Sequence, residues 1–262
     1  MSGAAIVFSS KSMLRWGLSL ALVYGLFLLS NMPAQRVVSW AQVQPFWTDS
    51  VILEGVQGTI WSGSVRAAYY EGLELRALSW RWRWSSALRM RLAFDFEFYG
   101  FQRAGHGRIA FVPGQIILTH LKLSEQSPNE LLELMAVPLN ATGNLSADIL
   151  RLRFSYQEGV RDISGSVSWE HAGLVFLNAW DLGSFKADLS PDHEGGLLAA
   201  VSNAGEPLGA DLILHLDYFG GFALRGSLQP GAGLAQPVKA VLQSLGSEDS
   251  DGRINLHLSG NL

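Results

Sequence analysis

The residue types that carry out most enzymatic chemistry are present in this chain, but their spacing fits no catalytic pattern. No serine has a glycine both two residues before it and two residues after it, which excludes the nucleophile elbow of hydrolases. There is no His-Glu-x-x-His sequence and no glycine-rich phosphate loop, and the histidines occur singly, at positions 106, 120, 171, 193, 215 and 257. The sequence therefore predicts no enzyme, no metal site and no cofactor.

Two weaker patterns favour a structural explanation over a binding site. Residues 249–252, Asp-Ser-Asp-Gly, resemble part of a calcium loop, but the glutamate that would complete it is absent, so we expect a solvated turn. Trp80, Trp82 and Trp84 alternate with arginines, and such residues can stack on nucleic-acid bases. Alternate residues of a strand point to opposite faces, however, so they cannot form one binding surface. Since the net charge is also −4, we expect no nucleic-acid partner.

The most distinctive pattern is Gly-Thr-Ile-Trp-Ser-Gly at residues 58–63. Glycines inside a strand-like stretch indicate a bulge or a close approach between backbones. Trp61 then has two interpretations: a core residue between glycine-opened strands, or a contact for a partner protein, where tryptophan is enriched. A glycine followed by a small polar and an apolar residue recurs at positions 143–145, 165–167, 226–228 and 260–262. These marks predict a sheet of similar strand units, the alternative being chance in a chain with 28 glycines.

The residues after this motif have the pattern of β-strands. Between Arg89 and Phe98, large apolar residues occupy every even position, which predicts a strand with one dry and one wet face. Residues 78–84 alternate in the same way, and we expect the two runs to form a hairpin whose tryptophans, with Trp61, fill the core. A bulge is expected near Ala77. The two registers that the sequence leaves open pair either Trp82 with Leu92, through a five-residue loop, or Arg81 with Asp95, through a longer one.

Two short helices interrupt the β pattern. Ser-Pro-Asn-Glu at residues 127–130 is a capping box with proline at the first helical position, and it predicts a helix over 128–135. The second helix is expected over 237–245, closed by Gly246. The expected fold class is mainly β with an antiparallel sheet; the pattern leaves open whether the sheet is curved or built from repeats. The chain has no cysteine, so packing and strand pairing alone must hold this domain together.

Residues 16–35 contain no charged side chain and predict a transmembrane helix. A helix rises about 1.5 Å per residue, so this run reaches about 30 Å, the thickness of the hydrocarbon layer. Lys11 and Arg15 precede the run and only Arg36 follows closely, which predicts residues 1–15 in the cytoplasm and residues 36–262 outside it. A cleaved signal peptide is the alternative, although the residues before Ala34 match a cleavage site poorly.

The anchor, the 58–63 motif and the tryptophan-rich strand after it resemble protein N of the bacterial type II secretion system. The shared features are the Gly-Thr-hydrophobic-Trp-x-Gly motif, a Leu-x-x-Leu-x-Trp strand that ends at Trp80, and the closing Leu-x-Gly-x-Leu at 258–262. The specific motifs fall within residues 50–100, whereas the similarity in layout covers most of the chain. Ser85 and Ser86 stand where members of this family often have a proline.

The resemblance implies a non-enzymatic accessory component that takes part in the export of folded proteins across the outer membrane. It implies a protein of the bacterial inner membrane that crosses it once and has its C-terminal domain in the periplasm. Other inner-membrane or periplasmic secretion components would be its partners. The residues of the family motif, with a structural or a partner-contact role, are Gly58, Thr59, Trp61, Gly63, Trp80 and Trp82.

An anchored periplasmic sheet with glycine marks also resembles the AsmA-like envelope proteins. That resemblance implies a curved sheet whose apolar groove holds lipid chains. Phe94, Phe96 and Phe98, together with the tryptophans of residues 80–84, would suit the lining of such a groove. A lipid is therefore the alternative partner, and the two hypotheses are compatible if protein N shares this fold.

Overall fold

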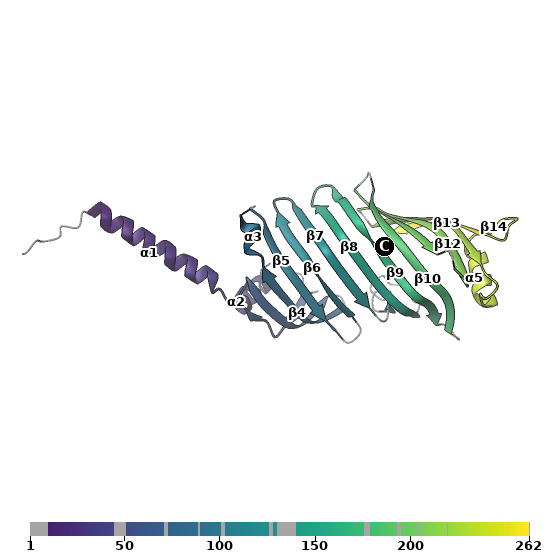
Figure 1. Ribbon diagram of the computed structural model, residues 1–262, viewed down its shortest axis with the longest axis horizontal. Coiled ribbons are helices and arrows are strands. Elements are labelled where there is room, and N and C mark those ends of the chain that lie inside the picture. The colour runs from purple at the N-terminus through teal and green to yellow at the C-terminus, as the bar shows by residue number, and fades with distance from the viewer. Residues whose placement is uncertain are drawn as a thin grey trace, which may run out of the picture.

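The protein is built on one long antiparallel β-sheet with a helical extension at its N-terminal end (Figure 1). The computed structural model describes residues 10–44, 51–70, 73–88, 90–100, 103–125, 128–129, 140–175, 179–192, 195–203, 205–218 and 220–261. Within them, 15 strands form a single sheet. The mainly β, antiparallel fold expected from the sequence is thereby confirmed.

The strands follow chain order across the sheet, so that each strand pairs with the next one along the chain. Two places depart from this order: β2 pairs only with β3, and β15 lies between β13 and β14. The strands are β1 (Val51–Glu54), β2 (Gln57–Gly58), β3 (Ser62–Tyr70), β4 (Leu73–Trp82), β5 (Leu92–Tyr99), β6 (Arg103–Val112), β7 (Gln115–Glu125), β8 (Asn140–Ser155), β9 (Gly159–Val175), β10 (Ala179–Pro191), β11 (Leu197–Asn203), β12 (Leu208–Leu216), β13 (Gly221–Pro230), β14 (Ser247–Glu248) and β15 (Ile254–Asn261). The helices are α1 (Ser10–Ser30), α2 (Ala34–Gln42), α3 (Trp84–Ala87) and α5 (Gln236–Leu245).

The register gives the sheet one polar face and one apolar face. Residues directly opposite each other in an antiparallel pair share a face, so a row can be followed from strand to strand. One row across β4 to β10 defines the polar face: Ser79, Glu97, His106, Lys122, Asp148, Ser166 and Asp188. A row on the other side defines the apolar face: Trp82, Phe94, Ile109, Leu118, Leu152 and Ile163.

The apolar face is concave at the C-terminal end of the sheet, where it forms the main core. The buried cluster there brings side chains of β9 and β10 together with side chains from the chain after β11, although β11 separates β10 from β12 in the sheet. Its members are Ala172, Leu182, Leu208, Ala210, Leu228, Leu234, Val238, Ile254 and Leu256. The sheet must curl for such contacts to form, and Figure 1 shows its last strands turned away from the plane of β5–β10. The helix expected over residues 237–245 is present as α5, and it packs against the concave side of the sheet.

Toward β4–β8 the apolar face is only half-buried. Trp82, Phe94, Ile109, Leu118 and Leu152 all keep part of their surface accessible. Most antiparallel sheets bury one face against a second layer of structure. Among the described residues no helix or sheet packs over this part, because α5 lies at the other end.

The recurring glycines mark close approaches between strands, as predicted. A Cβ added at Gly165 would lie 2.7 Å from the Ile149 Cα, and one at Gly226 would lie 2.7 Å from the Leu212 Cα. Gly143 has a φ of 109° and stands at a bulge in the pairing of β8 with β9. Gly260 differs in that the ring of Phe222, 2.9 Å from its hypothetical Cβ, covers it. The duplication of similar strand units stays a prediction.

The hairpin of β4 and β5 has the longer of the two loops that the sequence allowed. Its register pairs Arg81 with Asp95, and β5 begins at Leu92 rather than at residue 89. The helix α3 and the turn after it occupy the intervening residues. The expectation that Trp84 fills the core is therefore wrong, because the side chain lies on α3 and is 67% exposed.

The expected bulge near Ala77 takes another form. The pairing of β3 with β4 keeps one register on both sides of this residue. Ala77 itself has a φ of 47°, in the left-handed region, and its pairing is missing from the ladder. The change of parity between Leu75 and Leu78 is thus absorbed by one kinked residue rather than by an insertion.

The N-terminal helix α1 ends at Ser30, before the expected limit of the membrane segment at residue 35. Pro33 bridges Thr59, and α2 starts at Ala34. In the parts of the chain that the structure describes, no helix combines the length and apolarity needed to cross a bilayer. The helix expected over 128–135 falls largely outside the described residues.

One ion pair is buried within the sheet. The Arg103 guanidinium on β6 contacts the Glu125 carboxylate on β7 at 2.8 Å, and the two side chains are 8% and 2% exposed. A buried charge is costly without a partner of opposite sign, so each residue of this pair depends on the other. The pair fixes the end of the β6–β7 ladder, because Arg103 and Glu125 are also opposite each other in register.

Replacing Gly165 by alanine tests whether the glycine marks are required by close backbone contact. We expect Gly165→Ala to lower the free energy of unfolding by about 2–3 kcal/mol, since the methyl group would collide with the β8 backbone, which cannot rotate away. Urea unfolding of the full chain in detergent, followed by circular dichroism, measures this loss. Gly114→Ala is the control, because this turn has φ of 75° but open space around it. It should cost about 1 kcal/mol, and equal losses at the two sites would contradict the explanation.

Candidate functional site

The residues of the 58–63 motif form a tight turn between β2 and β3. Gly58 pairs with Gly63, and the φ of 84° at Gly58 lies in the left-handed region that glycine tolerates best. The Thr59 N–H donates to the Ser62 carbonyl at 2.9 Å, and the Ser62 N–H donates back to the Thr59 hydroxyl at 3.1 Å. The turn is therefore closed by its own polar groups, and Ile60 and Trp61 are left at its tip.

This turn holds the end of α1 against the sheet. The Trp61 indole N–H donates to the Leu29 carbonyl at 2.7 Å, in the last turn of α1. The Ile60 N–H donates to the Met32 carbonyl at 3.1 Å. The last carbonyls of a helix have no partner within it. The motif supplies partners for the carbonyls where the chain leaves α1, so it is the joint between α1 and the sheet.

The tryptophans of β4 pack onto the same joint. A Cβ added at Gly63 would lie 2.5 Å from the Trp80 ring, so the glycine gives this ring its place, and the Trp80 indole donates to the Ile60 carbonyl at 3.1 Å. The Trp82 ring lies against Trp61 with centroids 4.5 Å apart. The structure thus brings all six predicted motif residues together. The Trp61 side chain is half-buried, so it is neither a fully buried core residue nor a fully exposed contact for a partner protein.

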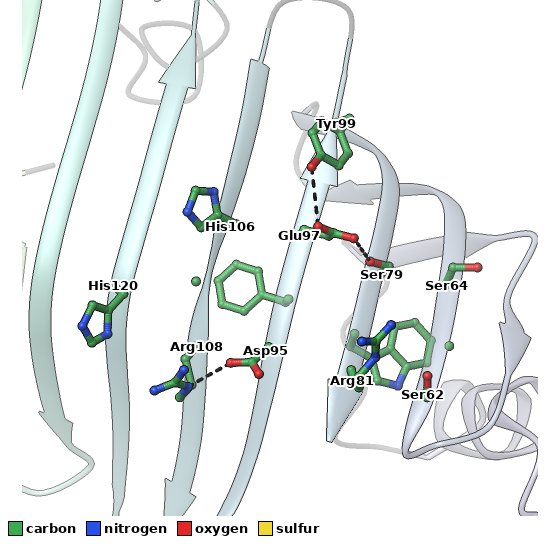
Figure 2. Close-up of a pocket in the computed structure, with 14 residues that line it drawn as sticks. Ser62, Ser64, Ser79, Arg81, Asp95, Glu97, Tyr99, His106, Arg108 and His120 are labelled. Carbon is green, nitrogen blue, oxygen red and sulfur yellow. Dashed lines mark hydrogen bonds and ion pairs between the residues drawn. The ribbon is translucent and has the colours of Figure 1, made fainter. Parts of the chain in front are cut away.

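A polar hollow of about 760 Å³ lies on the polar face beside this joint (Figure 2). Asp95 accepts a hydrogen bond from Arg108 at 2.8 Å and lies 3.5 Å from Arg83. Glu97 accepts hydrogen bonds from the Ser79 hydroxyl at 3.2 Å and the Tyr99 hydroxyl at 3.5 Å. The hollow is lined by Ser62, Gly63, Ser64, Ser79, Trp80, Arg81, Asp95, Phe96, Glu97, Tyr99, His106, Gly107, Arg108 and His120.

The arrangement of this hollow suits the binding of a charged surface better than it suits catalysis. The Ser79 hydroxyl donates to a carboxylate, so it is not oriented for activation by a histidine base. His106 and His120 come from neighbouring strands and point over the sheet surface, as Figure 2 shows. Among the described residues no three histidines, aspartates or glutamates converge as metal ligands would. The hollow offers both signs of charge on an open surface.

The sequence analysis missed this hollow as a site. The arginines and acids that alternate with the aromatic residues of β4 and β5 were the available signal. They reveal a common surface only when the register is known, because Arg81, Asp95 and Arg108 are brought into one row by two successive strand pairings.

A second polar cluster lies at the other end of β3 and β4. Burial and the nearby charge of Glu74 raise the pKa of Tyr69. The hydrogen bond from the Arg76 guanidinium, at 2.8 Å, lowers the pKa of Glu74. The shift keeps Glu74 ionised to lower pH, which maintains an exposed ion pair along the strand.

Comparisons with known proteins identify a family for this chain. The family described as Type II secretion system (T2SS), protein N, matches residues 49–257, which is most of the chain. The chain belongs to the type II secretion system protein N family. A relative in this family, the type II secretion system protein N of Klebsiella pneumoniae, is 25% identical over 249 residues, which cover 93% of this chain and 94% of the relative. No solved structure matches the chain.

The match to protein N begins close to β1 and ends within β15. It therefore covers the described sheet except residues 258–261 of β15, together with the 58–63 motif and the polar hollow. The helices α1 and α2 precede it. The resemblance inferred from residues 50–100 is confirmed, and it extends over far more of the chain than the specific motifs did.

Replacing Trp61 by phenylalanine tests the joint of this protein N family member. Trp61→Phe keeps the ring but removes the indole N–H that donates to Leu29. We expect the free energy of unfolding to fall by about 0.5–1.5 kcal/mol, as for a typical hydrogen bond, with faster amide exchange in residues 28–34 and 57–64. Hydrogen-exchange mass spectrometry of the full chain measures the second effect.

Trp16→Phe is the matched control, because Trp16 lies on α1 with its side chain exposed. It should leave amide exchange at both segments unchanged. Identical exchange in Trp61→Phe and the unmodified protein would show that the joint does not depend on this hydrogen bond.

Proposed function

We propose that this protein is a non-enzymatic accessory component of the type II secretion system in the bacterial inner membrane. Residues 1–15 are cytoplasmic, the segment 16–35 anchors the chain, and residues 36–262 form a periplasmic domain. The main support for this proposal is the contact of the 58–63 motif with the end of α1, which connects this helix directly to the sheet that the family match covers. Family membership supports a role in secretion.

The side chains of α1 support the anchoring role. Apolar residues with more than half their surface exposed occur on every side of the helix, among them Trp16, Leu18, Leu20, Val23 and Phe27. A helix that is apolar all round is typical of a buried or membrane-spanning segment. Lys11 and Arg15 lie in the first part of α1, before its uncharged run, and they favour a cytoplasmic N-terminus. The hydrogen bond between Trp61 and Leu29 favours a retained anchor over a cleaved signal peptide, because cleavage would remove its acceptor.

The polar hollow supports a partner surface for other inner-membrane or periplasmic components of the system. Its acids and arginines lie on an open face of the sheet, where another protein can reach them. Charges of both signs arranged in a fixed pattern give specificity and register to such contacts. Protein–protein contact is therefore the role that we assign to this face.

Gene deletion tests the proposed role most directly. We expect loss of the gene to lower the amount of exoprotein in the culture medium and the unmodified chain to restore it. Arg81→Glu, within the hollow, should restore secretion poorly because it reverses one charge of the pattern. Arg225→Glu should restore it fully, since Arg225 is equally exposed on β13 far from the hollow. Unchanged secretion of every exoprotein after deletion would count heavily against the role.

The apolar face favours a second candidate function, the binding of lipid chains. Its side chains over β4–β8 are half-buried, and no helix or sheet among the described residues covers them. An apolar surface of this extent is unusual unless a ligand or partner covers it. This function is compatible with the first, because the lipid-binding and polar faces are opposite sides of the same sheet.

Native mass spectrometry of the full chain, released from detergent, tests the second candidate. We expect retained phospholipid, and we expect Leu152→Glu to reduce it because a charge would enter the apolar row. Arg151→Glu is the matched control, since this neighbouring residue points to the polar face. A lipid-free protein that still captures secretion components would exclude lipid binding while leaving the first proposal intact.

A further inference from the structure

The connection between β4 and β5 exposes a group of large apolar side chains. We name Trp84, Leu88 and Met90 the hairpin tip; they are 67%, 90% and 93% exposed. Trp84 begins α3, and Leu88 caps its C-terminal end four residues later. Met90 has a φ of 52°, in the left-handed region, so its position is held at a backbone cost. Such exposure of adjacent large side chains marks a contact surface.

The hairpin tip is connected to the end of α1 by stacked tryptophans. The Trp61 indole contacts the Leu29 carbonyl at 2.7 Å, the centroids of Trp61 and Trp82 are 4.5 Å apart, and those of Trp82 and Trp84 are 4.1 Å apart. Figure 1 shows α3 at the end of the sheet that carries α1. The tip is therefore next to the place where the chain leaves the apolar helix.

The chemistry of the tip fits the boundary between lipid and water. Tryptophan is enriched at this boundary because its ring is apolar and its N–H is polar. Leu88 and Met90 supply side chains that can enter the acyl region, while the exposed Arg91 follows directly and can meet anionic headgroups. A water-facing loop would not need three exposed apolar side chains beside a basic residue.

We propose that the hairpin tip inserts into the outer surface of the bilayer that holds α1, as a second membrane contact. The proposal rests on the anchoring role given to the segment 16–35 above. One helix leaves the attached domain free to tilt about its exit point. A second contact on another element restricts that tilt, so the sheet takes a fixed orientation to the membrane surface.

The absence of cysteine in the chain gives a direct test. Ser85→Cys, on α3, and Gln157→Cys, in the turn between β8 and β9, are labelled with the fluorophore NBD in the full chain. Both positions are exposed, and both connections lie at the same end of the strands. The labelled proteins are reconstituted in vesicles of phosphatidylethanolamine and phosphatidylglycerol with and without a doxyl-labelled lipid as quencher.

We expect the lipid quencher to reduce NBD emission at position 85 by about twofold or more relative to position 157, because an interfacial group lies within the quenching layer. Leu88→Asp with Met90→Asp, in the Ser85→Cys chain, should abolish that difference. Circular dichroism checks that this variant is folded, and the same two substitutions made in the Gln157→Cys chain should leave the signal at position 157 unchanged.

Co-flotation of the protein with carbonate-washed vesicles separates the two proposals. Failure to float would overturn the anchoring role of α1 and, with it, the present proposal. A protein that floats but shows equal quenching at positions 85 and 157 would overturn insertion of the tip alone. That result would assign the exposed side chains to a protein partner, since the vesicles contain none.

Discussion

A single layer of β-sheet can leave only one of its faces to water, and this constraint determines most of the present structure. The register keeps acids, arginines and serines in rows on one side, and leucines, phenylalanines and tryptophans in rows on the other. The apolar rows are covered where the sheet curls around its own core and where α5 closes the curl. Glycines occur where the strands must approach closely for this curvature. The exception is the buried ion pair of Arg103 and Glu125, in which each charge compensates the cost of burying the other.

The sequence predicted those features that depend on local alternation. Period-2 patterns identified β4 and β5 and the opposite orientation of the Trp80 and Arg81 side chains, and the proline and glycine around residues 237–246 identified α5. Features that depend on loop length could not be predicted in the same way. The alternation of residues 89–91 was equally consistent with strand, yet Met90 and Arg91 precede β5, which begins at Leu92. For this reason Trp84 was misassigned to the core.

The candidate site was predicted in part for a similar reason. All six motif residues lie at one joint, because the glycines that made the motif visible are also those that let Trp80 pack there. The polar hollow needs five strands in register, and no local pattern contains that information. The link from Trp61 to Leu29 joins residues 32 positions apart. It places the motif in contact with both the sheet and the helix that precedes it.

The order of the strands has a consequence for how the protein is made. Because almost every strand pairs with the strand just before it, the sheet can form from its N-terminal end before the rest of the chain is available. The growing edge is then always the most recent strand, and it is covered as soon as the next one emerges. The outermost strands of the described sheet are short, with four residues in β1 and two in β14. On the C-terminal side β14 covers only Ile254 and Asn255, so within the described sheet the rest of β15 forms the last edge. An uncovered edge can pair with another chain, so folding in this direction leaves the part of the sheet most open to polymerisation until the end.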